Sequence, residues 1–242
     1  MTLLLAGRKR KRGGRPPIAL HWQEGNNPLP VRLLRAPRAP LSRFEQPHPW
    51  LATGPAAEPF DFCGHVRRLL VDIVARCAAL AHVDVSRLLL GMTRSRNGRP
   101  HGLQARVTPL RLSPRDPRRI DGEQVQRYYL DHHEFYYLLT FVLPRFLDLD
   151  FSEKLITLFH ELHHIGPRCD GDLRLADGRC AWHGRSRRQF DQEMARQARA
   201  YLAGKPDPNL HDFLRLTFAQ LQHRHQAVAA VEVPHPKIIG PS

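Results

Sequence analysis

The segment Leu155–Gly166 reads Leu-Ile-Thr-Leu-Phe-His-Glu-Leu-His-His-Ile-Gly, and the interpretation of the whole chain depends on it. Its apolar residues surround His160 and His164 almost continuously, which indicates a buried helix. Ser152 is the expected N-cap, and the closing glycine with the proline after it ends the helix, so we predict a helix over residues 152–165. Residues four apart lie about 40° apart around a helix axis, so both imidazoles are expected on one face.

The His-Glu-x-x-His spacing of this segment matches a metal-dependent chemistry. His160 and His164 can bind one divalent ion, because tetrahedral zinc accepts imidazole nitrogens presented at this spacing. Glu161 stands beside the first ligand and can reach a water in the remaining coordination position. Zinc acidifies such a water and polarises a carbonyl group, while the carboxylate takes the proton. The segment therefore predicts a zinc metallopeptidase, a hydrolase of peptide bonds in which Glu161 activates a zinc-bound water.

A chance occurrence of this pattern is the alternative, because the chain contains 15 histidines. We expect it by chance in roughly one chain in thirty of this length and composition. The apolar surround argues against chance, since imidazoles on a buried helix are costly unless they serve a ligand. A metal site is the favoured interpretation.

A catalytic zinc site needs a third protein ligand. His183 is the first candidate, because it lies in a glycine-flanked loop that precedes the next predicted helix and can fold back over the site. Glu193 is the rival, since it shares a helix side with Phe190 and Met194, and a buried glutamate there requires a cation. The remaining candidates are Asp170, Asp172 and Cys180.

Supporting roles in the site have several candidates. The donors that could stabilise negative charge on the substrate are Tyr201, His211 and Arg174. His163 points away from the expected ligand pair and is predicted to be packed or to support a ligand. Cys169 and Cys180 bracket the loop after the helix and could form a local disulfide or bind a second metal. The chain has no Cys-x-x-Cys pair, so a zinc ribbon is not expected.

Composition narrows the class of protein. A chain of 242 residues with 42% apolar residues can form one domain with tails. The net charge of +14 favours a polyanionic partner, with nucleic acid first. No apolar run is long enough to span a membrane, and the first residues do not match a signal peptide. We expect a soluble, cytoplasmic protein with no membrane partner.

Residues 1–58 are predicted to form a disordered, basic, proline-rich arm. They contain 10 Lys or Arg against 3 Glu, which suits non-specific contact with nucleic acid phosphates or a solubilising role. A zincin-like domain is expected over residues 59–228, followed by a loose tail over residues 229–242.

Hydrophobic periodicity predicts an α+β domain with a small sheet of about three strands. Helices are expected over residues 61–81 with Asp61 as N-cap, 152–165, 186–203 and 209–226. Strands are expected over residues 85–93, 103–112 and 134–143. Pro109 places the second strand near an edge. The third strand immediately precedes the histidine-bearing helix and is expected to offer its edge to an extended substrate.

Several segments resemble one family. They are Phe141-Val-Leu-Pro-Arg-Phe-Leu147, the run from Thr157 to Ile165, Asp170-Gly-Asp-Leu-Arg174 and His183-Gly184. Together they resemble the phage-type metallopeptidases, an intracellular zincin family. The resemblance covers roughly residues 60–204, and its specific part is residues 141–184.

A more distant resemblance concerns His183-Gly184 followed by Phe190. This arrangement is similar to the HExxH, His-Gly and Phe order of the SprT-like proteases, which act on protein bound to DNA, although no zinc ribbon follows in this chain. The resemblance implies that His160, His164 and His183 bind Zn²⁺ and that Glu161 is the general base. A nucleic-acid-associated binding protein with a structural zinc and no hydrolysis is the alternative function.

Overall fold

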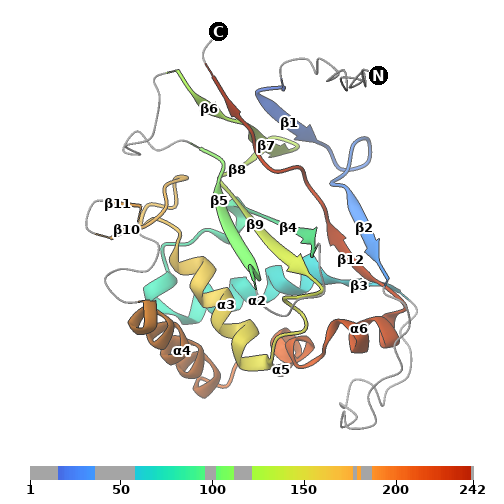
Figure 1. Ribbon diagram of the computed structural model, residues 1–242, viewed down its shortest axis with the longest axis vertical. Helices are drawn as coiled ribbons and strands as arrows, with labels where there is room; N and C mark the ends of the chain where they lie inside the picture. Colours follow the sequence, from blue (N-terminus) through green and yellow to red (C-terminus); the bar gives the residue numbers. More distant parts are fainter. Residues whose placement is uncertain are drawn as a thin grey trace, which may run out of the picture.

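The computed structural model describes residues 16–35, 58–95, 102–111, 122–176, 179–180 and 187–240, which form a mixed α+β structure (Figure 1). The strands are β1 (Ala19–Trp22), β2 (Val31–Leu34), β3 (Phe60–Asp61), β4 (Leu88–Arg94), β5 (Ala105–Pro109), β6 (Gln124–Val125), β7 (Arg127–Leu130), β8 (His133–Phe135), β9 (Tyr137–Leu143), β10 (Leu175–Ala176), β11 (Arg179–Cys180), β12 (Val228–Val231) and β13 (Ile238–Ile239). The helices are α2 (Phe62–Arg76), α3 (Phe151–His163), α4 (Arg187–Ala203), α5 (Pro208–His211) and α6 (Phe218–His225), with 3-10 turns η1 (Ala78–Leu80), η2 (Val85–Arg87) and η3 (Asp212–Arg215).

The sheet that positions the site has the strand order β4-β9-β5. Strand β4 runs parallel to β9, and β5 runs antiparallel to it. Alternate residues of β9 enter two different cores: Leu139 and Phe141 pack with α2 and α3, whereas Leu138 packs with residues of β1 and β7. Because both of its faces are buried, β9 is apolar along almost its whole length.

The predicted strands are present, but one of their expected roles is wrong. The strand expected over residues 134–143 is divided at Tyr136 into β8 and β9, and β9 is central rather than an edge. The strand expected over residues 103–112 is β5, and its predicted edge position is confirmed. Pro109 is tolerated because an edge strand leaves one side of its backbone outside the ladder. The edge beside the histidine-bearing helix therefore belongs to β5.

Helix α3 is held at both ends by side-chain and backbone contacts. Asp150, rather than the predicted Ser152, is the N-cap: its carboxylate accepts a hydrogen bond from the Glu153 amide at 2.7 Å. The Glu153 carboxylate accepts one in return from the Asp150 amide, which completes a capping box. After the helix, the Gly166 amide donates to the Asp172 carbonyl at 2.9 Å, and a Cβ at Gly166 would lie only 2.7 Å from that oxygen. Glycine is therefore required for this close approach.

The other helices agree with the predicted pattern in part. Asp61 caps α2 as expected, since its side chain accepts a hydrogen bond from the Gly64 amide at 3.0 Å. Helix α4 matches the helix expected over residues 186–203. The helix expected over residues 209–226 is instead divided into α5, η3 and α6, with a new capping box at Thr217.

The segments predicted to be a disordered arm and a loose tail contain strands that pair with distant parts of the chain. Strand β1 pairs with β7, and β2 pairs with β12. Strand β12 lies between β2 and β3, with Val228 fully buried and Ala230 1% exposed. These strands form because they pair with distant segments of the chain. The proline content of the segments gave no indication of such pairing. The rest of the expected arm lies outside the described residues.

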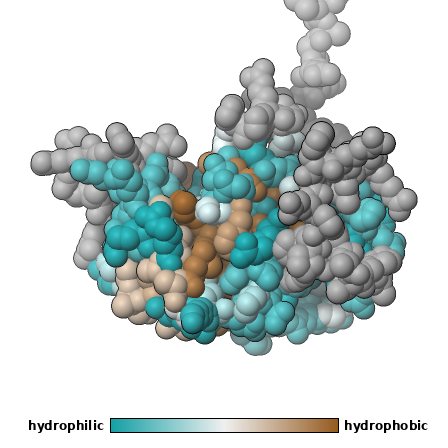
Figure 2. All heavy atoms as spheres, turned by 90° about the horizontal axis from the view of Figure 1, so that it is seen from below, coloured by the Kyte–Doolittle hydropathy of each residue, from teal (hydrophilic) through white to brown (hydrophobic). Residues whose placement is uncertain are grey.

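The face that lies below in Figure 1 carries a band of apolar residues between hydrophilic ones (Figure 2). In the part of the chain that the structure describes, no helix has the length and apolar character needed to cross a membrane.

Truncation tests the structural role of the C-terminal strands. A chain that ends at Ala227 lacks β12 and β13, and we expect its free energy of unfolding to fall by about 3 kcal/mol or more. Burial of a valine side chain alone contributes about 1.5–3 kcal/mol, and β2 and β3 also lose their shared partner. Urea unfolding measures the change. A chain that ends at Gly240 is the control, and equal midpoints for both truncations would mean that the tail is loose.

Candidate metal centre

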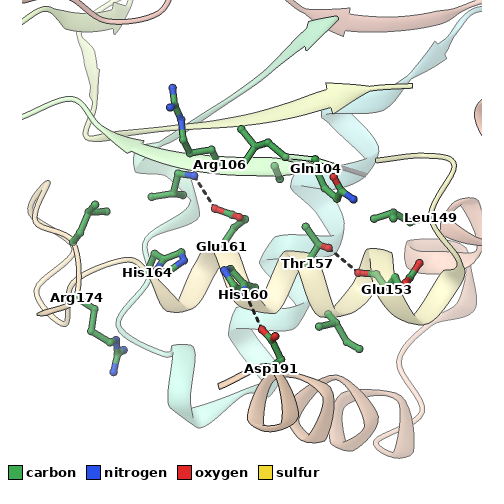
Figure 3. Close-up of a pocket in the computed structure, with 16 residues that line it drawn as sticks. Gln104, Arg106, Leu149, Glu153, Thr157, His160, Glu161, His164, Arg174 and Asp191 are labelled. Carbon is green, nitrogen blue, oxygen red and sulfur yellow. Dashed lines mark hydrogen bonds and ion pairs between the residues drawn. The ribbon is translucent and has the colours of Figure 1, made fainter. Parts of the chain in front are cut away.

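A cavity of about 530 Å³ lies between β5, α3 and the beginning of α4 (Figure 3). Residues 102–107 form one wall, and His160, Glu161 and His164 line it from α3 and its C-cap. Asp191 lines it from α4. The structure thus brings both histidines and the glutamate of the sequence pattern to one cavity.

His160 and His164 lie side by side on the same side of α3 (Figure 3). Their ring centroids are 4.8 Å apart and the rings are inclined by 76°. The ring of Phe190, from α4, packs against both, with centroids at 5.0 Å from His160 and 5.9 Å from His164. Two imidazoles with this spacing form a donor set that fits zinc, which takes nitrogen ligands.

Glu161 points from α3 toward the edge strand (Figure 3). Its carboxylate is buried and accepts a hydrogen bond from the Val107 amide at 2.7 Å. Burial raises the pKa of Glu161 to about 7, because desolvation disfavours the charged form more than the Val107 amide and Arg106 favour it. A carboxyl group with this pKa can exchange a proton near neutral pH.

His163 is turned away from the cavity, as expected from its position on the helix. Its ring packs on Phe190 at 5.1 Å, and its Nδ1 atom is buried without a hydrogen-bond partner among the described atoms. Burial, with the nearby charges of Arg174 and His82, lowers the pKa of His163 to about 4. The ring is therefore neutral near pH 7 and serves as a packing residue.

The expected third ligand, His183, lies outside the described residues. Within those residues, no three His, Cys, Asp or Glu side chains form a group that could hold a metal ion. Glu193 does not line the cavity: Arg196 donates two hydrogen bonds to its carboxylate, at 2.6 and 2.7 Å, and a third comes from Gln197. These hydrogen bonds lower the pKa of Glu193 to about 2. Arg196, and not a metal ion, is therefore the cation that neutralises Glu193.

The remaining ligand candidates are placed less favourably. Arg168 donates to the carboxylates of Asp170 at 2.6 Å and Asp172 at 3.1 Å, and neither aspartate lines the cavity. The side chain of Cys180 lies outside the part that the structure describes. Cys169 is a buried free thiol that accepts a hydrogen bond from the Asp84 amide.

One of the three candidate donors to a substrate lines the cavity. Tyr201 donates to Asp72 at 2.6 Å, and His211 lies 3.4 Å from Asp212, both outside the cavity lining. Arg174 does line it, and its amide donates to the His164 carbonyl at 2.7 Å.

Asp191 was not among the residues predicted from the sequence. Its Oδ1 atom lies 3.8 Å from Nδ1 of His160. Asp191 precedes the buried residues Met194 and Ala198 by three and seven positions, so it lies at the border of the apolar stripe of α4. The position of this acidic residue next to apolar residues of the helix was the feature of the sequence that could have identified it.

Comparisons of the chain with protein-family models, with curated proteins and with solved structures found no match. The site is therefore interpreted from its own geometry.

The buried carboxyl of Glu161 predicts a pH-dependent stability of the metal-free protein. Below about pH 4.5 this group is protonated in both the folded and the unfolded state. Between pH 4.5 and 7 the unfolded state loses the proton and the folded state keeps it, so stability falls by about 3 kcal/mol as pH rises.

Replacement of Glu161 by Gln should remove this loss. After chelation of metal, we expect the Glu161→Gln variant to be more stable than the wild-type protein at pH 8 and not at pH 4. Denaturant unfolding at both values measures the difference, with the exposed Glu24→Gln as control. A difference between Glu161→Gln and wild type that does not change with pH would show that folding does not raise the pKa of Glu161.

Proposed function

We propose that the chain is a zinc-dependent metallopeptidase with a zincin-like arrangement, related to the phage-type metallopeptidases. The observation that carries this proposal is that His160, Glu161 and His164 line one cavity beneath a sheet edge. A structural metal site needs no space for a substrate. Here the cavity that contains the two histidines also extends along residues 102–107, which leaves space for one. The site combines donors for a metal, a carboxyl group with a raised pKa and space for a substrate.

The proposed roles follow from the residues. His160 and His164 would hold the ion, and His183 would be the third ligand. Bound zinc would supply a Lewis acid that lowers the pKa of water and polarises the substrate carbonyl. Glu161 takes the proton from the water that attacks the carbonyl carbon, and then gives a proton to the departing amine. Phe190 restricts both imidazoles by packing against them.

The substrate is proposed to bind along β5 as an added strand. The Gln104 carbonyl accepts from Val142 and the Leu110 amide donates to Tyr136, both at 2.8 Å, so even-numbered residues of this segment face β9. Ala105 and Val107 therefore direct their backbone groups away from β9, toward α3 and the cavity. The Val107 amide already donates to Glu161, so an extended peptide would pair with the other backbone groups on this side.

The cavity wall also suggests a preference for apolar side chains. Leu103 is 52% exposed, and it lines the cavity together with the partly buried Leu149 and Ile156. An apolar side chain of the peptide would remove this surface from water, which favours binding.

Glu161→Gln tests the catalytic role. We expect the variant to retain zinc and to cleave labelled casein at least about 100-fold more slowly, because it lacks the general base. Metal analysis and a proteolysis assay provide the two measurements. As ligand controls, His183→Ala should lose zinc, and Glu193→Gln should retain both zinc and activity. Wild-type activity in Glu161→Gln would remove Glu161 from the mechanism.

A nucleic-acid-associated role with a structural zinc is the second candidate, and the distribution of charge favours it. The described residues contain 23 Lys or Arg and 19 Asp or Glu, whereas the remaining residues contain 14 and 4. Most of the excess positive charge therefore belongs to segments outside the described residues. Six of these basic residues fall within residues 1–15.

Deletion of residues 1–15 tests the contact with nucleic acid without removing β1 or β2. We expect weaker retention of duplex DNA, and a slope of log affinity against log salt that falls in magnitude by up to about 5, because six cations are lost. Fluorescence anisotropy at several salt concentrations measures both. Unchanged binding would make this segment irrelevant to partner choice. Zinc binding and DNA binding by the full chain, without proteolysis, would favour the second candidate function.

A further inference from the structure

The first turns of α4 are fixed against the histidines of α3. Phe190 packs its ring against His160, His163 and His164, with centroids between 5.0 and 5.9 Å away. Met194, one turn later, is fully buried in the main core. The position of the residue after Phe190 is therefore set by packing on both sides of it.

That residue is Asp191, and it faces His160 across the cavity (Figure 3). The Asp191 Oδ1 and His160 Nδ1 atoms are 3.8 Å apart, about 1 Å longer than a hydrogen bond between such groups. The Asp191 side chain is 49% exposed, so part of this carboxylate is in contact with solvent. The other acidic residue of α4, Glu193, is bound to Arg196.

An imidazole that binds a metal through one nitrogen carries a proton on the other, and an acceptor for that proton fixes both the tautomer and the orientation of the ring. A carboxylate is the strongest such acceptor, because it adds charge to the hydrogen bond. Asp191 presents a carboxylate to Nδ1, which leaves Nε2 of His160 for a metal.

We propose that Asp191 is a positioning residue that accepts a hydrogen bond from Nδ1 of His160 and so orients this ring for zinc. This inference rests on the proposed zinc site, but it assigns no ligand role to Asp191. Helix α4 would then contribute to metal affinity through His160. Loss of such a partner weakens metal binding by about 10- to 100-fold in comparable sites.

The test compares Asp191→Asn with Asp212→Asn in the full chain. Asp212 forms a second His-Asp pair, with its Oδ1 atom 3.4 Å from Nδ1 of His211, and it does not line the cavity. Competition with a chromophoric zinc chelator measures affinity, and the visible absorption of bound cobalt(II) reports the ligand geometry. We expect about 10- to 100-fold weaker zinc binding for Asp191→Asn alone, with a cobalt spectrum that keeps the same coordination number, and partial recovery in Asp191→Glu.

Each other outcome has a defined meaning. Equal affinity of Asp191→Asn and wild type would overturn the proposal, as would an equal loss in Asp212→Asn. A cobalt spectrum that shows a change in coordination number would also overturn it, because Asp191 would then be a ligand. If the wild-type protein binds no zinc, the proposed function fails together with the inference. If it binds zinc and Asp191→Asn binds it equally well, only the inference fails.

Discussion

A buried hydrogen bond from the Val107 amide to the Glu161 carboxylate joins the edge strand to the helix that carries the histidines. Its donor is available because β5 directs alternate backbone groups away from β9. Its acceptor is 6% exposed, and a carboxylate buried to that extent is costly without a donor. The contact thus sets the separation of α3 and β5. That separation determines the width of the cavity and brings the proposed base, the ligand pair and the strand edge together.

The position of α3 is further constrained over its whole length. Its N-terminus has a capping box, and the buried Lys154 ammonium donates to the carbonyls of Leu214 and Leu216 at 2.9 and 2.8 Å. Burial lowers the pKa of Lys154 to about 8, because the ammonium group is removed from water. The two carbonyls replace part of the lost hydration and stabilise the charged form. At the other end, Gly166 allows the chain to approach Asp172 closely. A rigid helix suits a metal site, because ligand geometry must be held to within fractions of an ångström.

Some features that depend only on residues close together in the sequence were predicted correctly. The four-residue spacing of His160 and His164 placed both rings in one cavity, and Pro109 correctly indicated an edge strand. Long-range pairing was not predictable in this way. Strand β12 is ordered because β2 and β3 pair with it from distant parts of the chain, and β9 is central because two other strands flank it. A proline-rich composition carries no information about such partners.

The two acidic residues of α4 show why the site was only partly predictable. Glu193 was considered a ligand because it shares a helix side with Phe190, but Arg196, three residues later, neutralises it. That ion pair has a helical spacing and could have been found in the sequence. Asp191 required a different argument, since its role depends on how α4 rotates against α3. That rotation is decided by Phe190 against the histidine rings and by Met194 in the core. The packing of α4 against α3 therefore determines that Asp191, and not Glu193, faces His160.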